Sequence, residues 1–166
     1  MKRLFMLAWL GLFISFFFVT NSHAQALLKD RIGAFDLMCE TPTGLDQEIC
    51  ALVQQVDNPD RQNARIVITI GKIVDNDSYF MRITAPLGIY LPRLLSLTID
   101  GKPLGEIPFI RCWPNGCMSE TALSGDLLSL LSKGNKAVFR IYPTPEEYVD
   151  LTVNLNGFTN GIKRLK

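Results

Sequence analysis

Cysteines are the residues of this chain whose spacing indicates chemistry most directly. There are four of them, Cys39, Cys50, Cys112 and Cys117. The last two enclose Pro114-Asn115-Gly116, and Asn-Gly is a strong tight-turn signal because both residues tolerate positive φ. Residues that face each other across the base of a tight antiparallel loop lie at the Cα separation that a disulfide requires. The spacing therefore predicts a disulfide across a hairpin.

Four cysteines allow three pairings, and the local pairing joins Cys39 to Cys50 and Cys112 to Cys117. Each local bond would close a small loop and contribute about 2 to 3 kcal/mol by restricting the unfolded chain. A zinc site of four thiolates is one alternative, although such sites prefer C-x-x-C pairs. A redox catalyst is another, although its C-x-x-C would begin a helix rather than span a turn. We predict disulfides, and neither a metal nor a cofactor.

The first 24 residues have the pattern of a secretory signal peptide. Met1-Lys2-Arg3 is basic, Leu4 to Val19 is apolar, and Ser22-His23-Ala24 places small residues at the −3 and −1 positions of a cleavage site. The apolar run of about 16 residues is shorter than a membrane span of about 20, and no second run follows. No cysteine stands at the cut site, which argues against a lipoprotein. We predict cleavage after Ala24 and no transmembrane segment in the mature chain, with a retained N-terminal anchor as the alternative.

Cleavage removes the only histidine, His23. Without an imidazole, nucleophile systems that use histidine and the common histidine-ligated metal sites are excluded. Two carboxylate clusters remain for acid–base chemistry, Asp57 with Asp60 and Glu146 with Glu147 and Asp150. Each cluster stands beside Pro, Asn or another charge, which is typical of a solvated surface. We predict no catalytic residue, with a hydrolase that uses only carboxylates as the alternative.

The charge of the mature chain is close to neutral. Once Lys2 and Arg3 are removed, about 15 basic residues face 16 acidic ones. Nucleic-acid binding depends on a basic stripe that neutralises phosphates. We therefore predict no nucleic-acid partner.

The mature chain, residues 25–166, has the length of one domain with a substantial core. The clearest strand pattern is 64–74, where Ile66, Ile68 and Ile70 alternate along one face. We expect residues 25–31 to lack regular structure. The predicted strands are 32–39, 49–56, 64–74, 79–85, 95–100, 104–112, 118–122, 137–142 and 148–155. About nine short strands separated by turn residues predict an all-β, mainly antiparallel sandwich or barrel.

One short helix is predicted after residue 123. Ser124 can cap its start, four leucines between 127 and 131 form an apolar stripe, and Gly134 ends it. Asp126 and Lys133 suit the positive and negative ends of the helix dipole. We expect this helix to cover one end of a sheet.

Residues 86–93 interrupt an apolar run with two prolines and a glycine, which predicts an edge or a crossover. Trp113 is the only tryptophan of the mature chain. One interpretation is an exposed apolar patch that binds a partner. The alternative is that Leu87 and its apolar neighbours pack inward while Trp113 covers the hairpin. The candidate partner-binding residues are Pro86, Leu87, Gly88, Ile89, Tyr90 and Trp113.

Several short motifs occur in a characteristic order: Gly33-Ala34-Phe35 before Cys39, Cys50 with Gln54, Pro86-Leu87-Gly88-Ile89, Ile99-Asp100-Gly101, Phe109 with Cys112, Gly116-Cys117, and Leu155-Asn156-Gly157-Phe158. With the exported leader, this order resembles the invasion-associated locus B family of bacterial exported proteins from about residue 33 to 165. The family tends to have Gly-x-Trp in the first motif, and Phe35 stands in place of that tryptophan. The resemblance implies a periplasmic or surface-associated protein, with founding members linked to entry into host red cells.

Together these observations predict an exported, non-enzymatic β protein that binds an unknown protein or envelope partner in the periplasm or at the outer surface. A role in host-cell interaction follows from the resemblance alone. An envelope-homeostasis factor, which would use a strand edge beside Pro86, is the alternative within the binding class.

Overall fold

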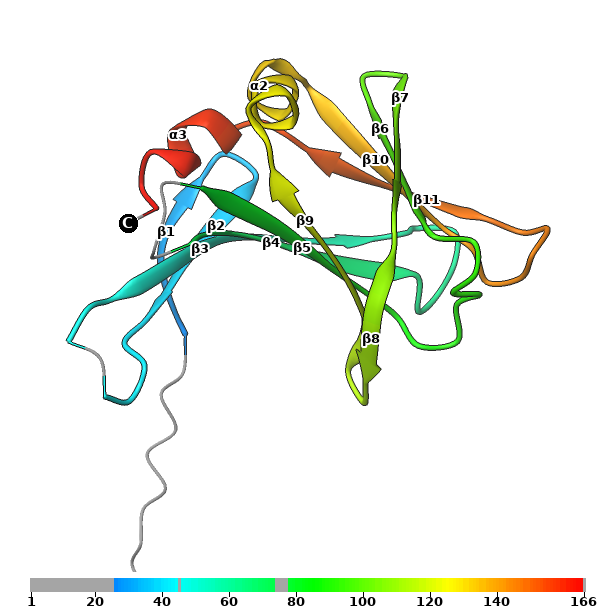
Figure 1. Ribbon diagram of the computed structural model, residues 1–166, viewed down its shortest axis with the longest axis horizontal. Helices are drawn as coiled ribbons and strands as arrows, with labels where there is room; N and C mark the ends of the chain where they lie inside the picture. The colour runs from blue at the N-terminus through cyan, green and yellow to red at the C-terminus, as the bar shows by residue number, and fades with distance from the viewer. Residues whose placement is uncertain (1–25, 45, 74–77, 166) are drawn as a thin grey trace, which may run out of the picture.

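The computed structural model describes residues 26–44, 46–73 and 78–165. The expected signal peptide, residues 1–24, lies outside the described residues. Two antiparallel sheets lie face to face, and two helices cover one end of them (Figure 1). The predicted fold class, a mainly antiparallel β-sandwich with a short helix and two disulfides, is confirmed.

The larger sheet has seven strands in the order β1-β2-β3-β4-β5-β9-β8, and the smaller has four in the order β11-β10-β6-β7. The strands of the larger sheet are β1 (Leu27–Ile32), β2 (Phe35–Glu40), β3 (Ile49–Asp57), β4 (Arg65–Lys72), β5 (Tyr79–Ala85), β9 (Gly116–Leu123) and β8 (Phe109–Trp113). The strands of the smaller sheet are β11 (Val149–Asn154), β10 (Lys136–Ile141), β6 (Leu95–Ile99) and β7 (Lys102–Ile107). The helices are α2 (Gly125–Lys133) and α3 (Phe158–Ile162).

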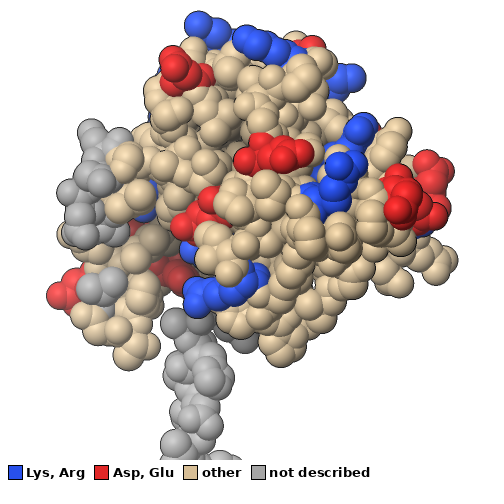
Figure 2. All heavy atoms as spheres, turned by 45° about the vertical axis from the view of Figure 1, so that its right-hand side comes forward, with Lys and Arg blue, Asp and Glu red and all other residues tan. Residues whose placement is uncertain are grey.

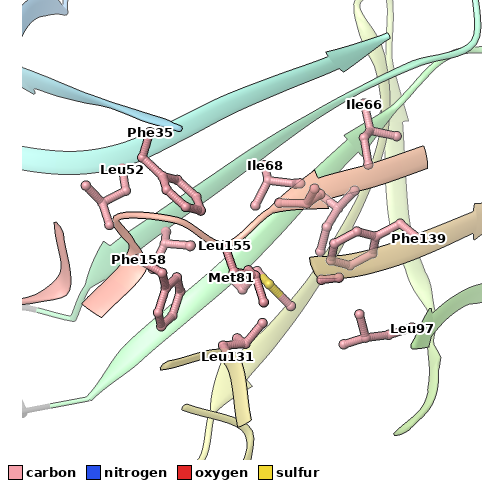
Figure 3. Close-up of a cluster of buried hydrophobic side chains, with 14 of the residues drawn as sticks. Phe35, Leu52, Ile66, Ile68, Met81, Leu97, Leu131, Phe139, Leu155 and Phe158 are labelled. Carbon is pink, nitrogen blue, oxygen red and sulfur yellow. The ribbon is translucent and has the colours of Figure 1, made fainter. Parts of the chain in front are cut away.

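The core forms between the two sheets because their strands alternate apolar and polar residues. In β4, Ile66, Ile68 and Ile70 are each at most 2% exposed. Figure 3 shows Ile66 and Ile68 in the same cluster as Phe139 from the opposite sheet. The alternation predicted for this strand is therefore confirmed. Removing the apolar side chains of one face from water favours this arrangement.

The residues predicted as one strand, 104–112, form two strands that belong to different sheets. β7 pairs with β6 in the smaller sheet, whereas β8 pairs with β9 in the larger one. Pro108 stands between them, and a proline has no N–H to donate to a continuous ladder. The chain therefore changes sheets at Pro108, which the prediction of a single strand missed.

Both predicted disulfides are present, and each joins neighbouring strands. Cys39 in β2 is bonded to Cys50 in β3, and Cys112 in β8 is bonded to Cys117 in β9. Cys39 and Cys50 are buried, and so is Cys117, but Cys112 is exposed. Because all four sulfurs are bonded in pairs, no thiolate is available to hold zinc.

The two ends of the described chain are joined by backbone contacts. The amide of Ala34, in the β1–β2 turn, donates to the carbonyl of Asn156 over 2.9 Å. The ring of Phe35 meets that of Phe158 edge to face, with centroids 6.0 Å apart. A Cβ on Gly157, whose φ is +91°, would lie 2.0 Å from the carbonyl oxygen of Ile32. Two motifs from opposite ends of the sequence therefore form one structural unit.

Residues 25–31 were expected to lack regular structure, and that expectation is wrong for most of them. β1 pairs with β2 from Leu27 to Ile32, with a bulge between Leu28 and Asp30. Its side chains are almost all exposed, so no apolar alternation marks it. Charged side chains and a bulge are features that discourage an edge strand from pairing with another chain.

The helix predicted after residue 123 is confirmed as α2. Ser124 accepts from the backbone N–H of Leu127, Asp126 lies in the first turn, and Gly134 follows the last residue. α3 was not predicted. Its five residues bury Phe158 and Ile162, so tertiary packing stabilises a turn whose sequence contains a glycine.

The free edge of β11 is covered by a side chain from the opposite sheet. The carboxamide of Gln54 in β3 accepts from the backbone N–H of Asn154 over 3.0 Å and donates to its carbonyl over 2.9 Å. This pair of hydrogen bonds replaces those of a further strand. It also links the two sheets along one side.

Candidate functional site

The segment predicted as an edge or crossover, 86–93, is a crossover between the sheets. It carries the chain from β5 in the larger sheet to β6 in the smaller one and contains no strand. The backbone N–H of Tyr90 donates to the carbonyl of Tyr142 over 2.6 Å. The guanidinium of Arg93 lies 4.7 Å from the ring centroid of Tyr142, and Ile89 packs against the core. These contacts hold the crossover against the β10–β11 connection.

The two interpretations of this segment each describe part of it. Ile89 is half-buried against the core, as the inward alternative expects. Leu87 is 54% exposed, and Tyr90 and Leu91 are 39% and 40% exposed. The inward residue anchors the crossover, while the others present apolar surface to solvent.

The disulfide hairpin lies beside the crossover. Pro114 and Asn115 at its tip, together with Pro86 and Leu87, line a hollow of about 410 Å³. The close approach requires Gly116, because a Cβ there would lie 2.5 Å from the carbonyl oxygen of Ala85. We call residues 86–91 together with 113–115 the crossover–hairpin surface.

Trp113 is held on the flank of the hairpin by a cation. The guanidinium of Arg111 lies 4.2 Å from its ring centroid, which is a cation–π contact. The indole is nevertheless 39% exposed. The contact limits the freedom of an aromatic ring that a partner would otherwise have to order on binding.

Ile110 is an exposed apolar residue that the sequence analysis did not select. It is 56% exposed in β8 and lies at the register shift between Phe109 and Arg111. The alternation rule assigns a face only to regularly paired residues, so a bulge hides such a position. The sequence signal for this exposed position was an isoleucine next to Phe109 and close to Cys112, in the first strand of the hairpin.

Charged groups do not form a single field around these features. Figure 2 shows acidic and basic side chains scattered over a mostly uncharged face. Within the hollow, Arg65 donates to Asp57, and this hydrogen bond lowers the pKa of the Asp57 carboxyl. The ion pair leaves the rim of the hollow close to neutral.

The two carboxylate clusters are rearranged relative to their grouping in the sequence. Asp57 pairs with Arg65, while Asp60 joins the second cluster around an open hollow of about 450 Å³. There Arg61 pairs with Glu147 over 2.8 Å, and Arg140 pairs with Asp150 over 2.6 Å. The carboxylates that line this hollow, Asp60, Glu146, Glu147 and Asp150, are all exposed. Four exposed carboxylates, of which Glu147 and Asp150 are in ion pairs, fit the solvated-surface interpretation better than that of a general acid and base.

Fold and surface together define a class of protein. It is an antiparallel β-sandwich with a filled apolar core, two cross-strand disulfides and apolar side chains exposed on its connections. No helix among the described residues is long and apolar enough to span a membrane.

Comparison with known proteins places the chain within this class. The family model described as "Invasion associated locus B (IalB) protein" matches residues 36–166. The chain belongs to the invasion-associated locus B family, as the order of its motifs predicted. It is similar to the crystal structure of invasion associated protein B from Bartonella henselae, with 23% identity and a TM-score of 0.68 over 81% of this chain and 92% of that chain. No curated protein matches it in a sequence search.

Some of the motifs that carried the resemblance contact each other in two separate places. Gly33-Ala34-Phe35 contacts the turn at Asn156-Gly157, and Gly116 lies against the end of β5 just before Pro86. These positions require a glycine, an aromatic ring or a disulfide for packing. Of these contacts, the one between Gly116 and Ala85 holds the hairpin beside the crossover.

Proposed function

We propose that this protein is an exported binding protein without catalytic activity, which acts in the periplasm or at the outer surface of a bacterium. The crossover–hairpin surface is its contact site for a protein or envelope partner. Family membership supports the bacterial envelope as the setting. The similar Bartonella protein is described as "invasion associated", which supports a role in host-cell interaction as the more specific proposal.

One observation carries this proposal. Leu87 exposes 54% of its surface on a segment that is anchored by backbone and core contacts, beside a hairpin whose tryptophan is 39% exposed. Exposed apolar side chains on a held backbone gain free energy when a partner removes them from water, at about 25 cal/mol per Å². Little ordering entropy opposes this gain, because the backbone and the indole already have contacts that restrain them.

Two further features support export. The N-terminal sequence has the pattern of a signal peptide, and two disulfides form most readily in an oxidising compartment. The absence of histidine from residues 25–166 removes the commonest acid–base residue, and the exposed carboxylates of Glu147 and Asp150 are engaged by arginines. A binding role is consistent with both.

The test is affinity capture with the processed protein, residues 25–166, on isolated bacterial envelopes and, in parallel, on host-cell membranes. Leu87→Asp places a charge at the centre of the surface and should abolish capture. Leu28→Asp is the matched control, because Leu28 is also 54% exposed but lies on β1. It should leave capture unchanged.

The two baits separate the versions of the proposal. Capture from envelopes alone supports an envelope-homeostasis factor, and capture from host membranes supports host-cell interaction. Equal capture by the parent protein and a folded Leu87→Asp variant would refute the assignment of the surface.

A further inference from the structure

A second surface feature lies where the two sheets separate. After Pro108 the chain continues as β8, which pairs with β9 in the larger sheet. Before Pro108 it runs as β7, which belongs to the smaller sheet and diverges from β9 (Figure 1). A groove of about 300 Å³ opens between β7, β9 and α2. It is separate from the crossover–hairpin surface, with which it shares no lining residue.

The floor of the groove is apolar. Leu104 from β7 and Leu127 and Leu130 from α2 are half-buried, and they pack against the core from outside it. Below them Leu97 is only 4% exposed. The groove therefore offers a strip of partly exposed leucine side chains that another apolar residue can cover.

One wall of the groove is the part of β9 around Thr121, where no strand of the described chain pairs on the side of β8. The Cα atoms of Cys112 and Cys117 are 3.9 Å apart, which is the spacing of a pair that exchanges no backbone hydrogen bonds. The backbone N–H and C=O of Cys117 therefore point away from β8. Because these groups alternate in direction from one residue to the next along a strand, those of Glu120 and Ala122 point to the side of β9 that faces β8. The pairing with β8 ends at Ser119. The N–H and C=O groups of Glu120 and Ala122 thus lie beyond the last residue of β8, and the Ala122 carbonyl has only a long contact of 3.4 Å from the hydroxyl of Thr121.

The rim of the groove is acidic. Glu106 and Asp126 line it from β7 and α2, and no lysine or arginine is among its lining residues. Both carboxylates are exposed. An apolar floor with a rim of one sign favours a partner whose apolar and cationic groups lie on opposite faces.

We propose that this groove binds an extended peptide segment of a partner protein, in which apolar and basic residues alternate. The segment adds to the free edge of β9 as a continuation of β8. Its apolar side chains cover Leu104 and Leu127, and its basic side chains face Glu106 and Asp126. Alternation with period two places the two kinds of side chain on opposite faces of one strand, as this arrangement requires.

Fluorescence anisotropy with a labelled acetyl-(Val-Lys)₃-amide peptide tests the proposal on the processed protein with both disulfides intact. We expect saturable binding that weakens as salt is added. The isomorphous (Val-Glu)₃ peptide should bind at least about tenfold more weakly, because attraction at the rim becomes repulsion. A (Val-Lys)₃ peptide with N-methyl groups on alternate residues should lose binding to a similar extent, since it keeps its side chains but cannot pair with a strand.

Protein variants then locate the site. Glu106→Lys with Asp126→Asn should reduce affinity for (Val-Lys)₃ about tenfold and restore binding of (Val-Glu)₃. Glu146→Lys with Asp60→Asn makes the same change in charge at the other hollow and should alter neither peptide. Leu87→Asp should also leave peptide binding unchanged, so failure of the crossover–hairpin surface is distinguishable from failure of the groove.

Equal affinity for the lysine and glutamate peptides, or an equal effect of the two charge variants, would overturn the assignment of the groove. Undiminished binding of the N-methylated peptide would overturn strand addition. In each comparison, circular dichroism establishes that the variants keep the fold.

Discussion

Replacing Gly157 with alanine should destabilise the protein by separating the two ends of its chain. Gly157 has a φ of +91°, and a Cβ there would lie 2.0 Å from the carbonyl oxygen of Ile32 and 3.0 Å from the Cα of Gly33. The obstructing atoms are backbone, so they cannot move aside as a flexible side chain would. The β1–β2 turn and the turn before α3 must therefore move apart.

The magnitude has three contributions. The positive φ costs a residue with a Cβ about 1 to 2 kcal/mol. Separation weakens the hydrogen bond from Ala34 to Asn156, which contributes about 1 kcal/mol, and the edge-to-face contact of Phe35 with Phe158, which contributes about the same. We expect a total loss of about 3 kcal/mol in the free energy of unfolding, or roughly 10 °C in Tm for a domain of this size.

Urea and thermal unfolding followed by circular dichroism measure this loss, and Gly101→Ala provides the control. Gly101 has a similar φ of +83°, but nothing lies within 4 Å of the position of its Cβ. Its substitution should carry the conformational strain alone, about 1 kcal/mol after allowing for the reduced entropy of the unfolded chain. Equal losses for the two variants would show that the junction of the chain ends contributes nothing, and would refute this reasoning.

Three further predictions concern the disulfides, a carboxylate and a strand edge. Limited reduction with dithiothreitol, followed by alkylation and peptide mass spectrometry, should label the Cys112–Cys117 pair before the Cys39–Cys50 pair. Only the former pair contains an exposed cysteine, and the reverse order of labelling would contradict this explanation. Hydrogen bonds from the backbone N–H groups that follow α2 lower the pKa of Asp100, so its stabilising effect is present above about pH 4 and is lost as the pH falls through the lowered pKa. The difference in stability between the parent and Asp100→Asn should accordingly shrink below pH 4 in urea titrations, and a difference that stays constant down to pH 2 would exclude this linkage. Gln54→Ala removes the side-chain partners of a backbone N–H and C=O of β11 and should lower the free energy of unfolding by about 1 to 2 kcal/mol. Gln55→Ala, at the next residue, is the control and should change it by less than about 0.5 kcal/mol. Similar values for both variants would show that the edge of β11 needs no cover.

Local patterns in the sequence predicted those features whose cause is local. The alternation of Ile66, Ile68 and Ile70 follows from burial of one face of β4, and the Ser124 cap and the Asn115-Gly116 turn are set by neighbouring residues. The disulfides followed from loop length and turn chemistry. Each of these is fixed by residues a few positions apart, which periodicity and turn rules can detect.

The features that the sequence analysis missed depend on distant parts of the chain. β1 has both faces exposed, so no alternation marks it, and its strand exists because β2 supplies a pairing edge. Pro108 could be recognised as an interruption, but which sheets its two flanking strands join is decided by β6 and β9. The groove is invisible for the same reason, since Leu104 and Leu127 meet only when the sheets diverge.

The crossover was predicted from the sequence, and its role in binding a partner stays a prediction. The crossover was located by its prolines and glycine, and Trp113 was selected because no other tryptophan remains after cleavage. What the sequence did not contain was the direction of each side chain, because Ile89 and Leu87 belong to the same apolar run. Their opposite environments depend on the bond from Tyr90 to Tyr142, more than fifty residues away.

The contact between the first turn and the last one affects the order in which the protein can fold. During synthesis β1 and β2 emerge well before Asn156 and Gly157, which supply the backbone against which their turn closes. Until those residues are made, the β1–β2 hairpin lacks this contact, and the ring of Phe158 does not yet cover Phe35. A fold closed by contacts between segments so far apart in the sequence is completed only after Asn156 and Gly157 are available to pack against the first hairpin.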